Sequence, residues 1–423
     1  MNLDDMKLQG TFLTMRSVLR LMAMAGDPGA KLVAASTKDP RPLYDSIRDK
    51  GEVINCNLGI FMTASYAVCN QVIRDSRFIV ETADSVTLDY LARPGNEHLV
   101  RPLQDSLMSM NPPEHTRLRK LVAPAFTLRE TWRRSDRIDA IVKRYLDRID
   151  PAAPFDLVPA YASPIPIQVV SEYLGIPEPD DKRFHRWGSV LGPALDGLKS
   201  MSEMHKLRTV LQELSDFFDE LIAYRRANPA DDVISGVLLN EPEDAPLERR
   251  ELVAITLLLL LAGLETTLNL IGNGVLALLE HDVERARFLA DPQLETNLVE
   301  EVLRYESPVQ FTIRTASEDI TLAGTTVPKG KQILVLIGGA NRDPRVFPDP
   351  DRFDIGRKNA RDHLSFSAGF HYCLGAGLAR LVAASALRQL FQRFPDLSLA
   401  GPVKRSSTRV IRGADSIPLV GGA

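Results

Sequence analysis

A single cysteine lies in a glycine-rich turn directly before an alanine-rich apolar stretch, and this pairing limits what the chain can fold into. The segment reads Phe366-Ser-Ala-Gly369-Phe-His371-Tyr-Cys373-Leu-Gly375-Ala-Gly-Leu-Ala379-Arg380. The glycines predict a turn, and the residues after it predict a helix. A thiol at a helix N-terminus is pushed toward thiolate by the helix dipole and the free backbone N–H groups. Cys373 is therefore a candidate metal ligand, and the alternative is a buried core thiol.

Composition and cysteine count exclude several classes of protein. The chain has 423 residues with a net charge of −4, so its length suggests roughly two or three domains. A net negative charge does not predict a nucleic-acid-binding protein. The three cysteines, Cys56, Cys69 and Cys373, form no disulfide framework and fit a reducing cytosol. No CxxC spacing is present, which argues against a zinc protein.

Neither apolar stretch of the chain predicts a membrane span. Residues 11–24 are interrupted by Arg16 and Arg20, so we expect an amphipathic helix docked on the protein. Residues 252–264 form the longest apolar run, bounded by Glu251 and Glu265. This run is too short to cross a bilayer, and we expect a buried core helix.

Helical patterns come first along the chain and short strands come late. Helical periodicity dominates residues 128–275, and a last helix is predicted at about 374–394. Short strands are predicted at residues 52–56 and 59–63 as a hairpin, and at 320–322, 332–337, 408–412 and 417–420. The order indicates a mainly α fold with a small β region.

The cysteine segment resembles the haem-binding signature of the cytochrome P450 family. The family pattern is matched at seven positions, which are Phe366, Gly369, His371, Cys373, Gly375, Ala379 and Arg380. Ser367 departs from it, because the family usually has glycine there. The resemblance implies haem b, held by a Cys373 thiolate on its proximal side, as dioxygen cleavage requires. It also implies the P450 fold, a triangular prism of helices around a buried haem, with residues 40–423 as one domain and 1–39 as an N-terminal helical extension.

A second motif, Glu301-Val-Leu-Arg304, places two opposite charges on one helix face. The family pairs this glutamate and arginine with a second arginine in a Pro-Asp-Arg-Phe stretch, which Pro350-Asp351-Arg352-Phe353 matches. The resemblance implies a structural cluster of Glu301, Arg304 and Arg352 behind the cysteine loop. A buried cluster of this kind contributes little net stability but fixes geometry.

A third motif, Ala262-Gly263-Leu264-Glu265-Thr266-Thr267, ends the long apolar run with an acid and two hydroxyls. The resemblance puts Ala262 over the distal haem face, gives Gly263 the role of leaving room for dioxygen, and makes Glu265 and Thr266 the catalytic pair that delivers protons. A hydroxyl beside a carboxylate suits proton transfer. The alternative is a threonine bonded to the preceding turn and a glutamate that caps a buried helix end.

A set of basic residues matches the family's haem-propionate ligands. His115 and Arg119 are one helical turn apart in Asn111-Pro-Pro-Glu-His115-Thr-Arg-Leu-Arg119, and Arg314 and His371 complete the set. Two haem carboxylates call for such counter-charges when they are partly buried. His363 is interpreted as a histidine that structures the loop.

The resemblance is strongest to soluble bacterial members of actinobacterial type, and it implies a cytoplasmic monomer. Such members take NAD(P)H electrons indirectly, through a ferredoxin reductase and an acidic ferredoxin. Lys120, Arg119 and Arg117 could steer that partner. The implied reaction inserts one oxygen atom of O2 into an unactivated C–H bond.

The expected substrate is a bulky apolar molecule, such as a lipid, sterol, terpenoid or polyketide. The predicted pocket takes parts of residues 78–107 and 191–198, together with Leu258, Leu261, Ala262, Val309, Phe311 and Ile411. Two alternatives remain open: a peroxide-driven peroxygenase, and a non-enzymatic haem sensor or carrier of an apolar ligand.

Overall fold

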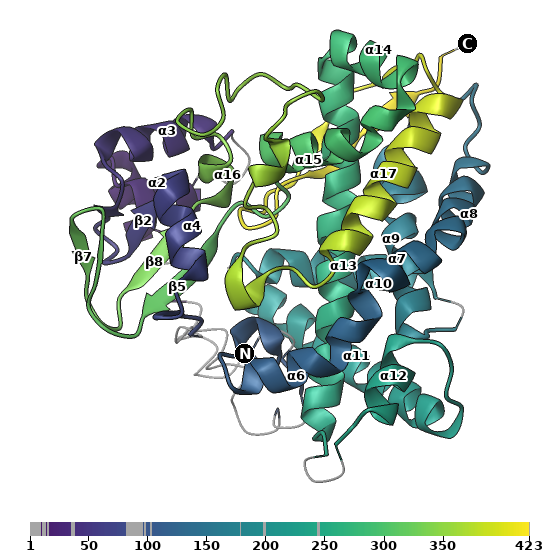
Figure 1. The fold of residues 1–423 in the computed structure, drawn as a ribbon, viewed down its shortest axis with the longest axis horizontal. Coiled ribbons are helices and arrows are strands. Elements are labelled where there is room, and N and C mark those ends of the chain that lie inside the picture. The colour runs from purple at the N-terminus through teal and green to yellow at the C-terminus, as the bar shows by residue number, and fades with distance from the viewer. Residues whose placement is uncertain are drawn as a thin grey trace.

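A β-rich part that includes the N-terminal helices lies beside a larger body of helices (Figure 1). The computed structural model describes residues 10, 14, 17–34, 39–81, 96, 99–101, 104–177, 179–197, 200–242 and 246–422. The mainly α fold with a small β region, predicted from the sequence, is confirmed.

The largest sheet joins segments from both ends of the chain in the order β1-β2-β8-β5-β3. Its strands are β1 (Ile54–Asn55), β2 (Phe61–Thr63), β3 (Phe78–Ile79), β5 (Thr312–Ala316) and β8 (Gln332–Val335). β1 and β2 form the predicted antiparallel hairpin, and β2 then runs parallel to β8 with Phe61 opposite Ile333. In Figure 1 the purple N-terminal elements therefore lie against the green strands, far apart in sequence.

Smaller sheets complete the β structure. A three-stranded sheet has the order β4-β12-β9, and two hairpins pair β6 with β7 and β10 with β11. The bounds are β4 (Phe155–Asp156), β6 (Ile320–Leu322), β7 (Thr325–Val327), β9 (Ser398–Leu399), β10 (Lys404–Arg405), β11 (Ala414–Ser416) and β12 (Pro418–Val420).

The N-terminal part of the chain forms a helix at residues 17–24, α2 (Pro28–Ala34), α3 (Arg41–Lys50) and α4 (Tyr66–Arg74). Of these, α3 and α4 pack on the large sheet. Leu32 of α2 is buried in one cluster with Tyr44 and Ile47 of α3, whereas the helix at 17–24 exposes Leu21 and Met24. The predicted extension at residues 1–39 thus contributes α2 to a core.

Helix α13 (Arg249–Glu280) runs through the middle of the helical body and packs against α9, α10, α15 and α17. Within the described part of the chain, it is the one helix long and apolar enough to cross a membrane, and its burial among other helices is typical of a core helix. Residues 262–267 end the apolar run but lie in the middle of this helix, not at its end, because α13 continues to Glu280. In this later part, the side-chain amide of Asn269 donates to the Glu265 carbonyl, and that of Asn273 donates to the carbonyls of Glu306 and Arg412.

The other helices surround α13. They are α6 (Glu114–Val122), α7 (Leu128–Arg133), α8 (Ser135–Leu146), α9 (Pro164–Leu174), α10 (Asp181–Ala194), α11 (Met201–Ala227), α12 (Val233–Leu239), α14 (Asp282–Ala290), α15 (Glu295–Tyr305), α16 (Ile337–Ala340) and α17 (Ala376–Arg393).

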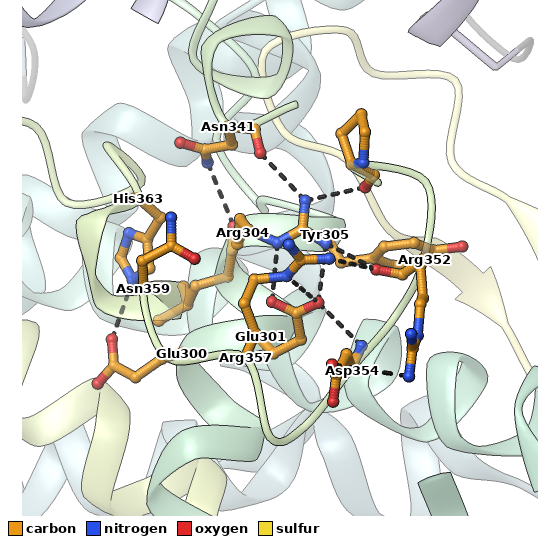
Figure 2. A network of polar contacts seen from close by, with 12 residues as sticks. Glu300, Glu301, Arg304, Tyr305, Asn341, Arg352, Asp354, Arg357, Asn359 and His363 are labelled. Atoms are coloured by element: carbon orange, nitrogen blue, oxygen red, sulfur yellow. Dashed lines mark hydrogen bonds and ion pairs between the residues drawn. The ribbon is translucent and has the colours of Figure 1, made fainter. Parts of the chain in front are cut away.

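A buried carboxylate on α15 holds two arginines (Figure 2). Glu301 and Arg304 have fully buried side chains, joined by Nε–Oε2 and Nη2–Oε1 contacts of 2.7 and 2.8 Å. The second arginine is Arg357, whose Nε lies 3.2 Å from Glu301 Oε1. The two guanidinium groups also donate to backbone carbonyls of residues 341 and 348–352, which fixes that segment on α15.

The prediction that Arg352 belongs to this cluster is wrong. Its side chain is 64% exposed and points toward Asp354, at 3.8 Å, while only its backbone carbonyl accepts bonds from Arg304 and Arg357 (Figure 2). The chain turns after Phe353, with the Arg357 N–H bonded to the Asp354 carbonyl, and this turn directs Arg357 back to Glu301.

The neighbouring residue, Glu300, ties the cysteine loop at both of its ends. Its carboxylate binds His363 Nε2 at 3.0 Å and Arg380 Nε at 2.7 Å, ten residues before and seven after Cys373. Burial alone would raise the pKa of Glu300, but the hydrogen bonds from His363 and Arg380 lower it to about 2. His363 therefore has the structural role predicted for it, and Glu300 is its partner.

Between these anchors, two residues of the loop have left-handed backbones. Gly369 has a φ of 65°, and a Cβ there would lie 2.8 Å from the Ile73 carbonyl oxygen, so glycine is required. Ser367 has a φ of 58°, and its buried Oγ has no hydrogen-bond partner among the described residues. The departure from the family pattern thus falls where a side chain costs stability.

We expect Arg357→Ala and Arg352→Ala to differ sharply in stability. Loss of Arg357 leaves Glu301 partly uncompensated in the core and should lower the free energy of unfolding by about 3–5 kcal/mol. Loss of exposed Arg352 should change it by less than about 0.5 kcal/mol. Guanidinium unfolding of the two purified variants measures both values, and equal losses would contradict the assignment of Arg357.

Ser367→Gly should raise the free energy of unfolding by about 1 kcal/mol, because glycine adopts a positive φ without the clash of a Cβ. Ser317→Gly is the matched control: Ser317 is exposed, and its φ is not positive. The control should be neutral or slightly destabilising. Thermal unfolding of both variants provides the test, and a Ser367→Gly protein no more stable than the wild type would refute the strain at this position.

Candidate functional site

Cys373 lies at the start of α17, as the glycine-rich turn predicts. α17 begins at Ala376, and the Cys373 N–H donates to the Phe366 carbonyl at 2.9 Å, which closes the loop across the turn. Phe366 packs under the Arg380 guanidinium, 4.4 Å from its ring centroid. These two contacts hold the loop between Phe366 and Gly375 against the start of α17.

The thiol of Cys373 does not have the lowered pKa that its place at a helix start predicts. Burial raises the pKa of Cys373, and the Gly375 N–H together with Arg119 and Arg380 opposes this rise without reversing it. The desolvation of the sulfur outweighs the helix dipole. A thiol in such a setting becomes a thiolate when a metal cation binds it.

Arg119 of α6 supports the cysteine loop directly. Its Nη1 donates to the Phe370 carbonyl at 3.1 Å and its Nη2 to the Tyr372 carbonyl at 2.7 Å. The residue was predicted to bind a propionate, but its two terminal nitrogens are directed to the loop. Its guanidinium therefore holds the backbone on the N-terminal side of Cys373.

Three other predicted propionate ligands, of which His115 and Arg314 are buried and His371 is partly buried, have no carboxylate partner among the described residues. The rings of His115 and His371 are in edge contact with centroids 4.7 Å apart, and His115 Nδ1 and His371 Nε2 have no hydrogen-bond partner among the described residues. Arg314 bonds only to Thr312 Oγ1 and the Ile313 carbonyl, and no carboxylate of the described residues pairs with it.

The pKa values of these basic groups are lowered, as expected where no negative charge of the described residues lies beside them. Burial lowers the pKa of Arg314 to about 10, and burial with repulsion from Arg314, His115 and Arg119 lowers the pKa of His371 to about 3. Burial and Arg119 likewise lower the pKa of His115. These basic side chains fit the two propionates of a haem, because a carboxylate beside them would favour their protonated forms and offset their mutual repulsion.

The distal motif lies in the middle of α13 and presents two residues on an accessible face. Ala262 is exposed although most of the helix around it is buried, and Thr266 Oγ donates to the Ala262 carbonyl at 2.5 Å. This bond is the back-bonding geometry of the alternative interpretation, and it leaves the hydroxyl at the surface of the helix. Gly263 lies close to α9, because a Cβ there would lie 2.6 Å from Val170 Cγ2.

Glu265 is directed to a different neighbour, helix α10. A Cβ at Gly188 would lie 2.6 Å from Glu265 Oε1, and one at Gly192 would lie 3.7 Å from its carboxyl carbon. These two glycines are one turn apart, so they form a notch for the carboxyl group. Burial, with a smaller effect of Asp415, raises the pKa of Glu265 to about 6. The side chain can therefore hold a proton near neutral pH.

The predicted pocket residues fall into groups. Val309 and Ile411 are brought together by an antiparallel bridge, and Leu258, Leu261 and Ala262 share one face of α13. Phe311 packs against the cluster of Leu32 and Tyr44 instead. Of the predicted flanking segments, residues 82–95, 97–98, 102–103 and 198–199 lie outside the described part of the chain.

Sequence reasoning missed Glu300, Arg357 and the glycine notch on α10. A second acid directly before Glu301 was a visible signal for Glu300, since adjacent helix residues point to different neighbours. The spacing of Gly188 and Gly192 gave a signal for close approach, but nothing in the sequence indicated that Glu265 fills it.

Comparison with known proteins agrees with this geometry. A family model described as cytochrome P450 matches residues 290–405. A protein of Mycobacterium tuberculosis described as cytochrome P450 140 is 36% identical over 97% of both chains. The vitamin D(3) 25-hydroxylase of Pseudonocardia autotrophica is 37% identical over 91% of this chain and 94% of its own.

A solved structure shows the same fold. The crystal structure of P450BioI in complex with an acyl carrier protein that carries hexadec-9Z-enoic acid has a TM-score of 0.84 and 34% identity, over 90% of this chain and 98% of that one. The cysteine loop, the Glu301–Arg304 pair and these relatives lead to one conclusion: the chain belongs to the cytochrome P450 family and is a haem-thiolate monooxygenase.

Proposed function

We propose that this protein hydroxylates an unactivated C–H bond of a bulky apolar molecule, with electrons delivered by a ferredoxin and its reductase. The observation that carries the proposal is the adjacency, on one turn of α13, of an accessible hydroxyl at Thr266 and a partly buried acid of raised pKa at Glu265. A protein that only senses or carries an apolar ligand has no use for this pair.

The haem supplies dioxygen binding, electron uptake and the oxidising power for the reaction. Cys373 would hold its iron, with the Gly375 N–H donated to the sulfur. Arg314, His115 and His371 would bind the propionates, since they are basic, at least partly buried, and lack other anions among the described residues. Arg119 and Arg380 fix the loop on either side of the sulfur.

Glu265 and Thr266 would supply the protons that dioxygen cleavage consumes. With a pKa of about 6, the Glu265 carboxyl keeps its proton at pH values where an exposed glutamate has lost it. Thr266 can accept a proton and pass on its own, because its hydroxyl is both donor and acceptor. The carboxyl can then be reprotonated from the α10 side, so the two residues act in sequence.

The substrate proposal rests on apolar side chains and on the relatives. Leu258 and Leu261 offer apolar surface beside Ala262 on α13, and the bridged pair of Val309 and Ile411 offers more, which suits a lipid, sterol, terpenoid or polyketide. The names of the relatives point to vitamin D(3) and to a hexadecenoic acid on a carrier protein. Both are bulky apolar compounds, in agreement with the proposed class.

Electrons would come from NAD(P)H through a reductase and a small acidic ferredoxin. Of the three basic residues predicted to steer this partner, Arg117 pairs with Glu251 and Arg119 bonds to the cysteine loop. Lys120 is exposed and remains the steering charge of that set. We further propose a cytoplasmic monomer, with residues 40–423 acting as one domain and 1–39 as its extension.

Peroxide-driven and electron-driven turnover can be separated with Thr266→Ala. The substrate is one that shifts the haem spin state in a screen of lipids, sterols and polyketides. With ferredoxin, reductase and NAD(P)H, the wild type should form product with matching oxygen uptake, and it should use peroxide poorly. Product per NAD(P)H should fall by about 100-fold in Thr266→Ala, with peroxide released instead.

Thr256→Ala is the matched control, because Thr256 makes the same back-bonds within α13 but lies outside the motif. It should keep wild-type coupling. Tight coupling in Thr266→Ala would exclude the proton-delivery role, and equal turnover with peroxide alone would favour the peroxygenase. Spin-state shifts without any turnover would favour a ligand binder.

Gly188→Ala should uncouple the enzyme without touching α13. The added methyl group would occupy the place of Glu265 Oε1 and displace the carboxyl from its notch. Product formation by the wild type should fall as the pH rises through about 6, because the Glu265 carboxyl loses its proton there. In Gly188→Ala this fall should occur at a different pH. Gly236→Ala, in a helix where a Cβ meets nothing within 4 Å, should leave the profile unchanged. An unaltered pH profile in Gly188→Ala would contradict the notch.

A further inference from the structure

A buried aspartate just beyond α10 binds the tip of the β10–β11 hairpin. Asp196 has a side chain only 2% exposed. Its Oδ2 accepts the Arg409 backbone N–H at 2.6 Å, and its Oδ1 accepts the Val410 backbone N–H at 2.8 Å. One carboxylate therefore takes two successive N–H groups, an arrangement that fixes the backbone whatever side chains it carries.

Arg409 extends this contact to a third segment. Its Nη2 donates to the Asp196 carbonyl at 2.6 Å, and its Nη1 donates to the Val33 carbonyl of α2 at 2.8 Å. The end of α10, the hairpin tip and the N-terminal helix are thus joined at one point. We refer to Asp196, Arg409 and the N–H of Val410 as the clasp.

The other side of the hairpin tip forms part of the predicted pocket wall. The Val410 carbonyl accepts the Gln310 N–H at 2.9 Å, the Pro308 carbonyl accepts the Arg412 N–H at 2.7 Å, and Ile411 bridges Val309. The tip is therefore held between Asp196 on one side and residues 308–310 on the other. Because the strands β10 and β11 are short, the position of Ile411 depends on both attachments.

We propose that Asp196 is a positioning residue for the substrate wall: it sets the place of Ile411 and Val309 through the backbone of residues 409 and 410. The inference rests on the proposed function for its ligand class. In this proposal Asp196, which lies outside the haem site, influences which apolar molecules fit the pocket. Because Asp196 directly follows α10, the shape of the pocket wall depends on the same helix that carries the glycine notch for Glu265.

The first test measures the clasp itself and needs no substrate. In the haem-loaded protein, Asp196→Ala should raise hydrogen exchange at the amides of residues 409 and 410 by about tenfold or more, because both lose a charge-assisted acceptor. Arg409→Ala keeps these two backbone bonds and should raise exchange much less. Asp196→Asn, which keeps one acceptor oxygen, should be intermediate and serves if the alanine variant holds haem poorly.

The second test measures the pocket wall with two iron ligands of different size, imidazole and 4-phenylimidazole, read from the haem absorption spectrum. Asp196→Ala should change the ratio of their dissociation constants by about tenfold, with imidazole alone little affected. Asp156→Ala is the control, because Asp156 also accepts backbone N–H groups from the C-terminal region, at Ile417, and from Val158, but not at the hairpin tip.

The outcomes separate the clasp from the proposed function. Unchanged exchange at residues 409 and 410, or an equal change of the ligand ratio in Asp156→Ala, would overturn the role of Asp196. A changed ratio in Asp196→Ala alone supports it. Failure of every apolar compound to turn over would remove the proposed hydroxylation but leave this result standing, since neither azole is a substrate.

Discussion

Two adjacent carboxylates on α15 are the constraint on which the proximal structure depends. Neighbouring positions on a helix point about 100° apart, so Glu300 and Glu301 reach different parts of the protein. Glu300 binds His363 and Arg380, which bracket the cysteine loop, and Glu301 binds Arg304 and Arg357, which hold residues 348–352. One turn of α15 therefore fixes both the loop that carries Cys373 and the segment packed behind it.

The basic residues and the thiol around the cysteine loop suit a bound group that carries both negative charge and a metal cation. Arg314, His115 and His371 have lowered pKa values and no anionic partner among the described residues, whereas burial raises the pKa of the Cys373 thiol. Burial thus disfavours the charged form of every one of these groups. A haem satisfies them together, because its propionates meet the basic residues and its iron meets the sulfur.

Helix α10 connects the proposed chemistry with the proposed selectivity. Its two glycines accept the Glu265 carboxyl, and the turn that follows it supplies Asp196 to the hairpin tip beside Val309 and Ile411. A small displacement of this helix would therefore change the surroundings of the acid and of the pocket wall at the same time. Its packing against α13 makes such coupling direct.

The sequence by itself determined the parts that depend on spacing along the chain. The glycine-rich turn before α17, the Glu301–Arg304 pair three residues apart and the β1–β2 hairpin follow from local geometry. Only the tertiary structure decided that Arg357 rather than Arg352 reaches Glu301, that Arg119 holds the loop, that burial raises the pKa of Cys373, and that Glu265 turns to α10. These outcomes depend on the path of the chain and on desolvation by distant segments, and neither is encoded in the spacing of neighbouring residues.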